Sequence, residues 1–254
     1  MNSHMKNNLW PCWLTLLTML TVPISGCGAS PDGDSSGTEY TYTESNRDGI
    51  GKIYMEREIS HVMGHRGASW LDRPERMTEE RTDLLIENLP LRPGDKVADI
   101  GAGTGFFSLQ MARIVGDAGL VFAVDIQPEM LDIIKERSTD QQLENVRRVL
   151  ATEKSPGLPD NEIDLALFVD AYHEFEWPRE VMSGVYTSLK PGGKIVLIEY
   201  RAEDPEVPIL RLHKMSEMQA RLEMEALGFV FAENLEMLPQ QHFLIFEKPA
   251  QTAR

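Results

Sequence analysis

The chain has 254 residues, of which 42% are hydrophobic and 26% charged, an ordinary composition for a globular protein. Its formal net charge of −15 argues against a DNA or RNA substrate, because an acidic protein repels phosphates. Both cysteines, Cys12 and Cys27, lie before residue 30, which excludes a disulfide framework, a cysteine zinc site and a cysteine nucleophile from the rest of the chain.

The first 26 residues predict an export signal. Lys6 precedes an apolar run from Leu9 to Ile24, which is short for a membrane span and is interrupted by Pro11 and Pro23. Such a run is typical of the hydrophobic region of a secretory signal. It ends in Ile24-Ser25-Gly26-Cys27, which resembles the bacterial lipobox, whose cysteine is lipidated and becomes the mature N-terminus.

We therefore expect a signal peptide over residues 1–26, a lipidated Cys27 and a flexible tether over residues 27–50 that is rich in Gly, Ser and Asp. The protein would then be a cell-envelope lipoprotein, facing the periplasm or attached to the outer membrane, with Cys27 as its membrane contact. The alternative is a chance apolar N-terminus, which would leave the protein in the cytoplasm.

Two helices are expected before the first long strand. Residues 52–64 predict a helix whose apolar positions are Ile53, Met55, Ile59 and Val62. A second helix is expected after Pro74, with an apolar face made of Met77, Leu84, Leu85 and Leu89. In the loop between the two helices, His65 and Trp70 are candidates for lining a site. The alternative places Trp70 in the core and His65 on the surface.

The stretch from Val97 to Ser108 predicts a buried strand, a glycine turn and a helix start. The glycines at 101, 103 and 105 permit positive φ angles and close approach of a ligand, towards which the free N–H groups of the helix point. A dinucleotide turn has the spacing G-x-G-x-x-G, whereas Phe106 stands where its third glycine would be. Asp99, just before the turn, suits an amino-bearing or cationic ligand better than a pyrophosphate.

A second buried strand is expected over residues 120–125, ending in Asp125, which lies 20 residues beyond Gly105. A carboxylate at that position can accept hydrogen bonds from both hydroxyl groups of a ribose. The alternative is that Asp125 caps the helix expected to start near Pro128. A third strand is expected over residues 145–150, followed by a loop over residues 151–159.

A fourth strand over residues 163–170 leads into Asp170-Ala171-Tyr172-His173-Glu174-Phe175, at the sheet edge where ligands bind in such folds. His173 is the best candidate for a general base, because imidazole titrates near neutrality. Asp170 and Glu174 could orient His173 or contact the substrate. The alternative is that His173 only caps the strand–helix connection. Secondary candidates on the same edge are Glu199, Tyr200 and His213.

The remaining chain predicts further sheet and helix. A helix is expected after Pro178, and a Pro-Gly-Gly turn within residues 189–193 leads into a fifth strand ending near Tyr200. A helix from His213 to Leu227 and an antiparallel pair of strands over residues 229–237 and 242–247 follow. No internal repeat and no zinc-ligand spacing is visible, so no metal is expected.

Three features in chain order resemble the class I S-adenosylmethionine-dependent methyltransferases: the glycine turn, Asp125 and the stretch Leu189–Gly193. The resemblance covers roughly residues 52–248 and implies a Rossmann-like, doubly wound α/β domain over residues 51–249. It implies seven strands in the order 3-2-1-4-5-7-6, the last strand antiparallel, with N-terminal helices covering the cofactor. The cofactor-binding residues that it implies are Asp99, Gly101, Ala102, Gly103, Gly105, Asp125, Ile126, Thr152, Glu153 and Asp170.

The resemblance implies S-adenosyl-L-methionine as cofactor and a small-molecule or lipophilic methyl acceptor, with His173, Asp170 and Glu174 as the catalytic residues. The runner-up functions are a non-catalytic nucleotide-binding protein of the cell envelope and an NAD-dependent oxidoreductase. Phe106 and Asp99 disfavour the oxidoreductase. An export signal favours the binding protein, because S-adenosylmethionine is made in the cytoplasm. The sequence leaves the oligomeric state and the methylated atom open.

Overall fold

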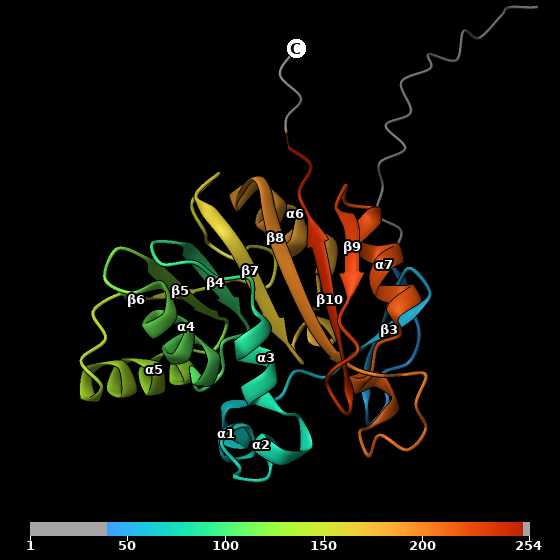
Figure 1. Ribbon diagram of the computed structural model, residues 1–254. Helices are drawn as coiled ribbons and strands as arrows, with labels where there is room; N and C mark the ends of the chain where they lie inside the picture. The colour runs from blue at the N-terminus through green and yellow to red at the C-terminus, as the bar shows by residue number, and fades with distance from the viewer. Residues whose placement is uncertain (1–39, 251–254) are drawn as a thin grey trace, which may run out of the picture. The chain divides into compact units, whose positions relative to one another are not determined.

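A sheet of seven strands organises the computed structural model, which describes residues 40–250 (Figure 1). The spatial order, β6-β5-β4-β7-β8-β10-β9, is 3-2-1-4-5-7-6 when the strands are counted along the chain, and β10 is antiparallel to both neighbours. The predicted fold is therefore confirmed. The strands are β6 (Val146–Leu150), β5 (Leu120–Asp125), β4 (Lys96–Ile100), β7 (Ile163–Val169), β8 (Leu189–Tyr200), β10 (Gln241–Glu247) and β9 (Val230–Asn234).

The central strands are apolar on both faces because helices cover both. Ala98 of β4 pairs with Phe122 of β5 and Ala166 of β7 in parallel register, and all three side chains are buried. Neighbouring positions along each strand point to opposite faces, so each strand contributes to two separate cores.

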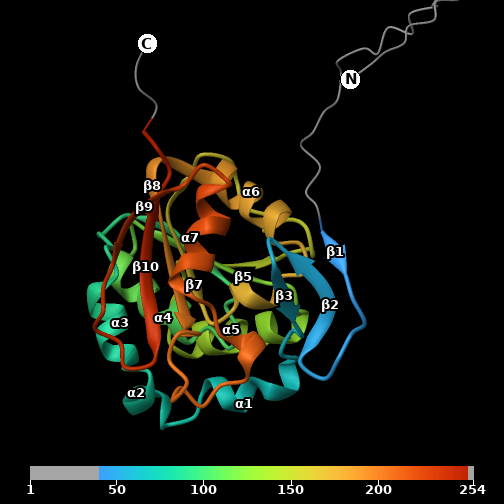
Figure 2. The same ribbon diagram turned by 90° about the vertical axis from the view of Figure 1, so that its right-hand side faces the viewer.

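Three helices lie over one face of the sheet and two over the other (Figures 1 and 2). Proline at the first helical position starts α5 and α6, and the Ser216 hydroxyl caps α7 by accepting the Gln219 N–H at 3.1 Å. The first face carries α3 (Thr82–Asn88), α4 (Phe106–Val115) and α5 (Pro128–Asp140); the second carries α6 (Pro178–Ser188) and α7 (Glu217–Glu225).

Residues 49–60 form a hairpin, so the helix predicted over residues 52–64 is wrong. The small antiparallel sheet consists of β1 (Thr41–Tyr42), β2 (Gly49–Tyr54) and β3 (Arg57–Ser60), and it stands apart from the large sheet (Figure 2). The β2–β3 turn holds Met55 and Glu56 at φ angles of 46° and 71°, which hairpin turns favour and helices exclude. Burial of Tyr54 and Ile59 anchors the hairpin to the core.

Residues 41–50, which the sequence assigned to the tether, contribute β1 and the beginning of β2. Tyr40 packs against Tyr54 and Trp177 with ring centroids 5.3 Å away in each case, and its hydroxyl donates to Glu180 at 2.5 Å. These contacts hold the segment to the domain. Residues 1–39, and with them the predicted signal peptide and Cys27, lie outside the described residues.

The helix predicted after Pro74 is divided, because Arg81 adopts a left-handed conformation with φ of 53°. The helix predicted from His213 begins only at Glu217. Within residues 40–250, none of the helices has the length and apolar character needed to cross a bilayer. The short helical segments are η1 (His65–Gly67), α1 (Ala68–Leu71), α2 (Arg76–Glu79), η2 (Tyr172–Glu174) and η3 (Arg211–His213).

Candidate active site

A glycine turn joins β4 to α4 and lines a cavity at the edge of the sheet. Gly101 and Gly103 have φ angles of 76° and 53°, and both line this cavity of about 530 Å³. A Cβ atom at Gly101 would lie 2.6 Å from the Ala171 Cβ, and one at Gly103 would lie 2.6 Å from Leu71 Cδ1. The turn is therefore a closely packed cradle that only glycine fits.

The carboxylate of Asp125 closes one side of this cradle. It accepts the Gly103 N–H at 2.8 Å through Oδ2 and the Gln127 N–H at 2.9 Å through Oδ1. Burial raises the pKa of Asp125, and these backbone N–H groups oppose the rise by stabilising the ionised form. Ile126, the next residue, lies in the wall of the cavity. Thr152 and Glu153, from the loop after β6, line the same cavity.

Asp170 lies at the end of β7 and lines the same cavity. Its φ of 50° turns the chain sharply, and its Oδ2 accepts the Gln241 side-chain N–H at 2.7 Å. Within residues 40–250, the buried Oδ1 has no hydrogen-bond partner. Burial, followed by repulsion from Glu80 and Glu199, raises the pKa of Asp170 well above its ordinary value. The site thus contains an acceptor oxygen that needs a donor.

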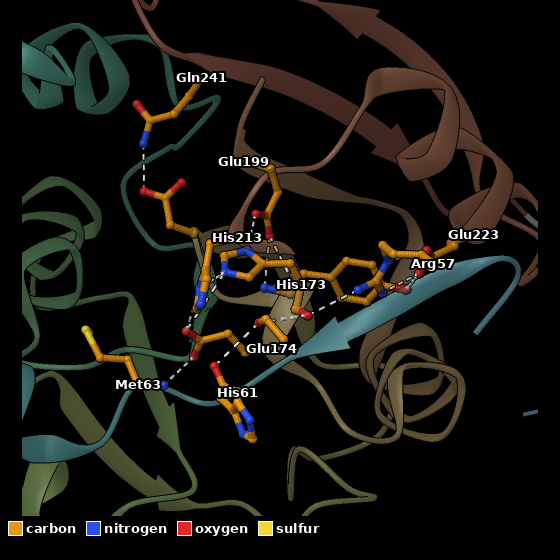
Figure 3. Close-up of polar contacts among 12 residues, drawn as sticks. Arg57, His61, Met63, His173, Glu174, Glu199, His213, Glu223 and Gln241 are labelled. Carbon is orange, nitrogen blue, oxygen red and sulfur yellow. Dashed lines mark hydrogen bonds and ion pairs between the residues drawn. The ribbon is translucent and has the colours of Figure 1, made fainter. Parts of the chain in front are cut away.

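His173 lies beside this cavity, in a cluster of polar side chains (Figure 3). Its Nδ1 contacts Glu199 Oε2 at 2.5 Å, and its Nε2 lies 3.1 Å from Nδ1 of His213. Burial lowers the pKa of His173, but the contact with Glu199 outweighs it, and the net shift is upward. Both ring nitrogens are therefore engaged, and His173 is almost wholly buried.

Glu174 connects this cluster to the cavity that it lines. Its Oε2 accepts the Met63 N–H at 3.1 Å, and its Oε1 lies 3.6 Å from His213 Nδ1 and 3.9 Å from His173 Nε2. Figure 3 shows Glu174 between Met63 and the two histidine rings. Of the secondary candidates, Glu199 and His213 belong to this cluster, whereas the Tyr200 hydroxyl donates to Glu80 at 2.9 Å.

The cavity brings together most of the residues predicted to form the site. The predicted residues that line it are Gly101, Gly103, Asp125, Ile126, Thr152, Glu153, Asp170 and Glu174. Those that do not are Asp99, Ala102, Gly105 and His173, and neither His65 nor Trp70 reaches it.

Asp99 lies behind the turn and accepts the Ser108 hydroxyl at 2.6 Å. Burial raises the pKa of Asp99 to about 6, although the bond from Ser108 works in the opposite direction. The hairpin, which the sequence pattern did not predict, and the segment that follows it supply another wall of the cavity through Ile50 and residues 60–63.

Comparison with known proteins places this geometry in a family. A family described as a methyltransferase domain matches residues 91–241. The chain belongs to this methyltransferase family. A ubiquinone/menaquinone biosynthesis C-methyltransferase from Shewanella woodyi is 30% identical over 168 residues, which are 63% of this chain and 67% of that protein.

Solved structures agree in fold. An S-adenosylmethionine-dependent methyltransferase from Aquifex aeolicus superimposes with a TM-score of 0.69 and 24% identity, over 74% of this chain and all of that one. A second, described as a methyltransferase of this kind from Methanococcus maripaludis, has a TM-score of 0.59 and 17% identity, over 77% of this chain and all of that one. The protein is thus a class I methyltransferase whose cofactor is S-adenosylmethionine, and not an NAD-dependent oxidoreductase.

The cavity of this methyltransferase fits S-adenosylmethionine on two independent observations. Gly101 and Gly103 line the cavity without side chains, so a ligand can lie directly against their backbone. The unpartnered Oδ1 of Asp170 is an acceptor for which the ammonium group of the methionine part is a matching donor. Within residues 40–250 this oxygen has no partner, which a donor on the bound cofactor would supply.

Proposed function

We propose that this methyltransferase acts on a small lipophilic acceptor with a hydroxylated ring. The observation that carries the proposal is a cavity bounded in part by the β2–β3 hairpin and the segment after it, with apolar walls and a polar cluster on one side. A cavity of about 530 Å³ suits a small molecule rather than a macromolecule. The Shewanella woodyi relative is named as a C-methyltransferase of ubiquinone/menaquinone biosynthesis, and quinones are lipophilic ring compounds.

The cofactor side of the cavity is assigned to the residues of the cradle and its surroundings. We assign Gly101 and Gly103 to the backbone contact, Asp125 to the ribose hydroxyls, and Asp170 to the ammonium group. Ile126, Thr152 and Glu153 form the wall at which the adenine would lie. The shape of the turn is fixed by residues that do not line the cavity, Asp99, Ala102 and Gly105. Gly105 packs against Ile134, and the Ala102 N–H donates to the Val124 carbonyl.

The acceptor side is assigned to the hairpin residues, Phe175 and the cluster around His173. The bound cofactor supplies an electrophilic methyl group. The protein has to hold the acceptor in line with that methyl group and to accommodate the proton that the acceptor loses. Glu174 lines the cavity and contacts His173, so the two residues act on the acceptor as a unit, with Asp170 beside them.

Incubation of the full-length protein with deuterium-labelled S-adenosylmethionine tests this function. The acceptors would be hydroquinones and phenols with and without a hydrocarbon tail, and matched rings that lack the hydroxyl group. We expect label in the hydroxylated, tailed rings and little in the matched rings, as measured by mass spectrometry. Label appearing only in amines or in water-soluble acceptors would contradict the proposed acceptor class.

We propose from the apolar run and the motif Ile24-Ser25-Gly26-Cys27 that the N-terminal region is an export signal. Residues 1–26 would be a signal peptide, Cys27 would be lipidated, and the chain between Cys27 and Tyr40 would be the tether. An acylated N-terminus would hold the enzyme at a membrane surface, where lipophilic acceptors concentrate. The location therefore supports the same class of acceptor as the apolar walls of the cavity.

A further inference from the structure

We propose that His173, Glu174 and His213 bind a divalent transition-metal ion of the zinc type at the acceptor side of the cavity. Within residues 40–250, these three residues are the group whose ligand atoms lie close enough together, all within 4.8 Å of one another. Two imidazoles and one carboxylate, with a remaining open position, are a ligand set found in catalytic zinc sites. Binding of the ion is independent of the proposed acceptor; only the role given to the ion rests on that proposed function.

The three ligand atoms are spaced as a small ion requires. His173 Nε2 and His213 Nδ1 are 3.1 Å apart, and Glu174 Oε1 lies 3.9 Å from the first and 3.6 Å from the second. Of the points equidistant from all three atoms, the nearest lies in their plane at about 2.1 Å from each, which is the length of a zinc–nitrogen or zinc–oxygen bond. The triangle of atoms could hold the ion without movement of the backbone.

Neighbouring groups also orient two of the ligands, His173 and Glu174, as is usual for metal ligands. Glu199 Oε2 contacts Nδ1 of His173, and its Oε1 accepts the backbone N–H groups of Tyr172 and His173 at 3.0 and 3.3 Å. This carboxylate–histidine contact orients the ring and strengthens Nε2 as an electron donor. The Met63 N–H fixes Glu174 in the same way (Figure 3).

Charge in the cluster favours a cation. Two carboxylates, Glu174 and Glu199, contact the single buried ring of His173. Backbone N–H groups already bond to both carboxylates, and Arg57 donates to the His173 carbonyl. A divalent ion between His173, His213 and Glu174 would add positive charge next to Glu174, whereas two neutral ring nitrogens at 3.1 Å can share only one proton.

The position of Glu174 in the cavity wall gives the ion access to the acceptor. A hydroxyl oxygen of the acceptor at the open position would lose its proton more readily, which increases the electron density of the ring. The methyl–sulfur bond then breaks with both electrons remaining on sulfur, and the new bond forms to the acceptor. The products are methylated acceptor, S-adenosylhomocysteine and one proton released to water, so the ion is neither oxidised nor reduced.

Zinc binding by the full-length protein tests the site without reference to methyl transfer. The protein is treated with a chelator, dialysed, titrated with Zn²⁺ against a chromophoric competitor, and analysed for zinc content after gel filtration. We expect one zinc per chain in the wild type and at least about 10-fold weaker binding in the His213→Ala and Glu174→Gln variants. The matched control is His242→Gln, because His242 also contacts a carboxylate, Glu203 at 3.0 Å, away from this cluster.

Glu199→Gln tests the positioning role, since it keeps the shape of the side chain and weakens the acceptor of the His173 proton. We expect zinc affinity to fall about 10–100-fold while circular dichroism and S-adenosylhomocysteine binding stay unchanged. Wild-type protein without stoichiometric zinc, or variants that bind it as well as the wild type, would overturn the inference. Stoichiometric zinc together with failure to methylate any hydroxylated ring would overturn the proposed acceptor and leave the metal site standing.

Discussion

Arg57 in the hairpin and Glu223 in α7 are 166 residues apart in sequence and are joined by two hydrogen bonds of 2.7 and 2.9 Å. Glu223 is fully buried, and it also accepts the Tyr172 hydroxyl at 2.7 Å and the Gln219 amide at 2.9 Å. Arg57 additionally donates to the His173 carbonyl at 3.1 Å. Arg57 therefore joins the hairpin to α7 through a buried ion pair and to the segment that carries the site through the His173 carbonyl.

Breaking this pair should destabilise the protein strongly. Arg57→Met leaves the Glu223 carboxylate buried without its cation, which should cost about 3–5 kcal/mol of unfolding free energy. Urea denaturation measures this cost, and the Arg57→Met/Glu223→Met double variant should recover much of it. The control is Lys96→Met, which breaks the exposed Lys96–Glu162 pair and should have a far smaller effect. Equal losses of unfolding free energy in Arg57→Met and Lys96→Met would contradict the role of the buried pair.

Asp125→Ala should weaken the binding of S-adenosylhomocysteine by about 1–3 kcal/mol, the value of hydrogen bonds to a charged group. The carboxylate also accepts the Gly103 N–H, so its removal loosens the cradle as well. Calorimetric titration measures the change, with Asp132→Ala on the exposed side of α5 as the control. Unchanged affinity in Asp125→Ala would remove Asp125 from the cofactor site.

Gly101→Ala and Gly192→Ala form a matched pair. Both glycines have positive φ, 76° and 79°, and either alanine should cost about 1–3 kcal/mol of stability through the backbone. Of the two, only Gly101 would bring the new Cβ against another side chain, since a Cβ at Gly192 would meet no atom within 4 Å. Thermal unfolding should therefore find a larger loss of stability for Gly101→Ala than for the control. Calorimetric titration should find a loss of cofactor affinity only in Gly101→Ala.

Asp99 should make stability without cofactor fall as pH rises. Its pKa is about 6 in the folded protein and about 4 in an unfolded chain, so the folded state binds more protons between these values. The penalty of ionising Asp99 is absent below about pH 4 and complete above about pH 6, where it is on the order of 2–3 kcal/mol.

The Asp99→Asn variant removes this titration. Compared with the wild type by urea denaturation from pH 4 to 8, it should gain relative stability as the pH increases. Asp117 is exposed, so Asp117→Asn serves as a control. Its unfolding free energy should change with pH in the same way as that of the wild type. A stability difference between Asp99→Asn and the wild type that is independent of pH would contradict the raised pKa of Asp99.

The proposed lipidation predicts a change of location. Cys27→Ser should move the protein from the membrane fraction to the soluble fraction, because stable anchoring depends on acyl chains. Cofactor affinity should be unchanged, since the variant leaves residues 40–250 intact. Mass spectrometry of the wild type should find residues 1–26 removed and Cys27 acylated. A soluble cytoplasmic wild type that retains Met1 would contradict the export signal.

The large sheet could be predicted because its signals are local. Each parallel strand is a short apolar run, and the turn after β4 and the carboxylate at the end of β5 lie at fixed distances in the sequence. The hairpin could not be predicted, because Met55 and Glu56 occupy positions with positive φ that normally signal themselves through glycine or asparagine. The break between α2 and α3 could not be predicted for the same reason, because Arg81, and not a glycine, adopts the φ of 53° there.

The acceptor side shows a second limit. His173 and Glu174 were singled out as a pair, but their neighbours Glu199 and His213 lie 26 and 40 residues from His173, on β8 and η3. No spacing rule connects these positions, since the sheet edge alone brings them together. The same reason explains why no metal-ligand spacing was visible: two ligands are adjacent and the third comes from a distant loop.

The ion pair between Arg57 and Glu223 can form only late in the synthesis of the chain. A ribosome adding about 5–20 residues per second makes the hairpin roughly 8–33 s before it reaches Glu223, because 166 residues separate the pair. During that interval, the arginine has no buried carboxylate to dock against, although the strands of the cradle have already been made. The buried ion pair can therefore form only after α7 has emerged, and a chain released before that point would keep the hairpin's contacts with residues 172–174 but lack this pair.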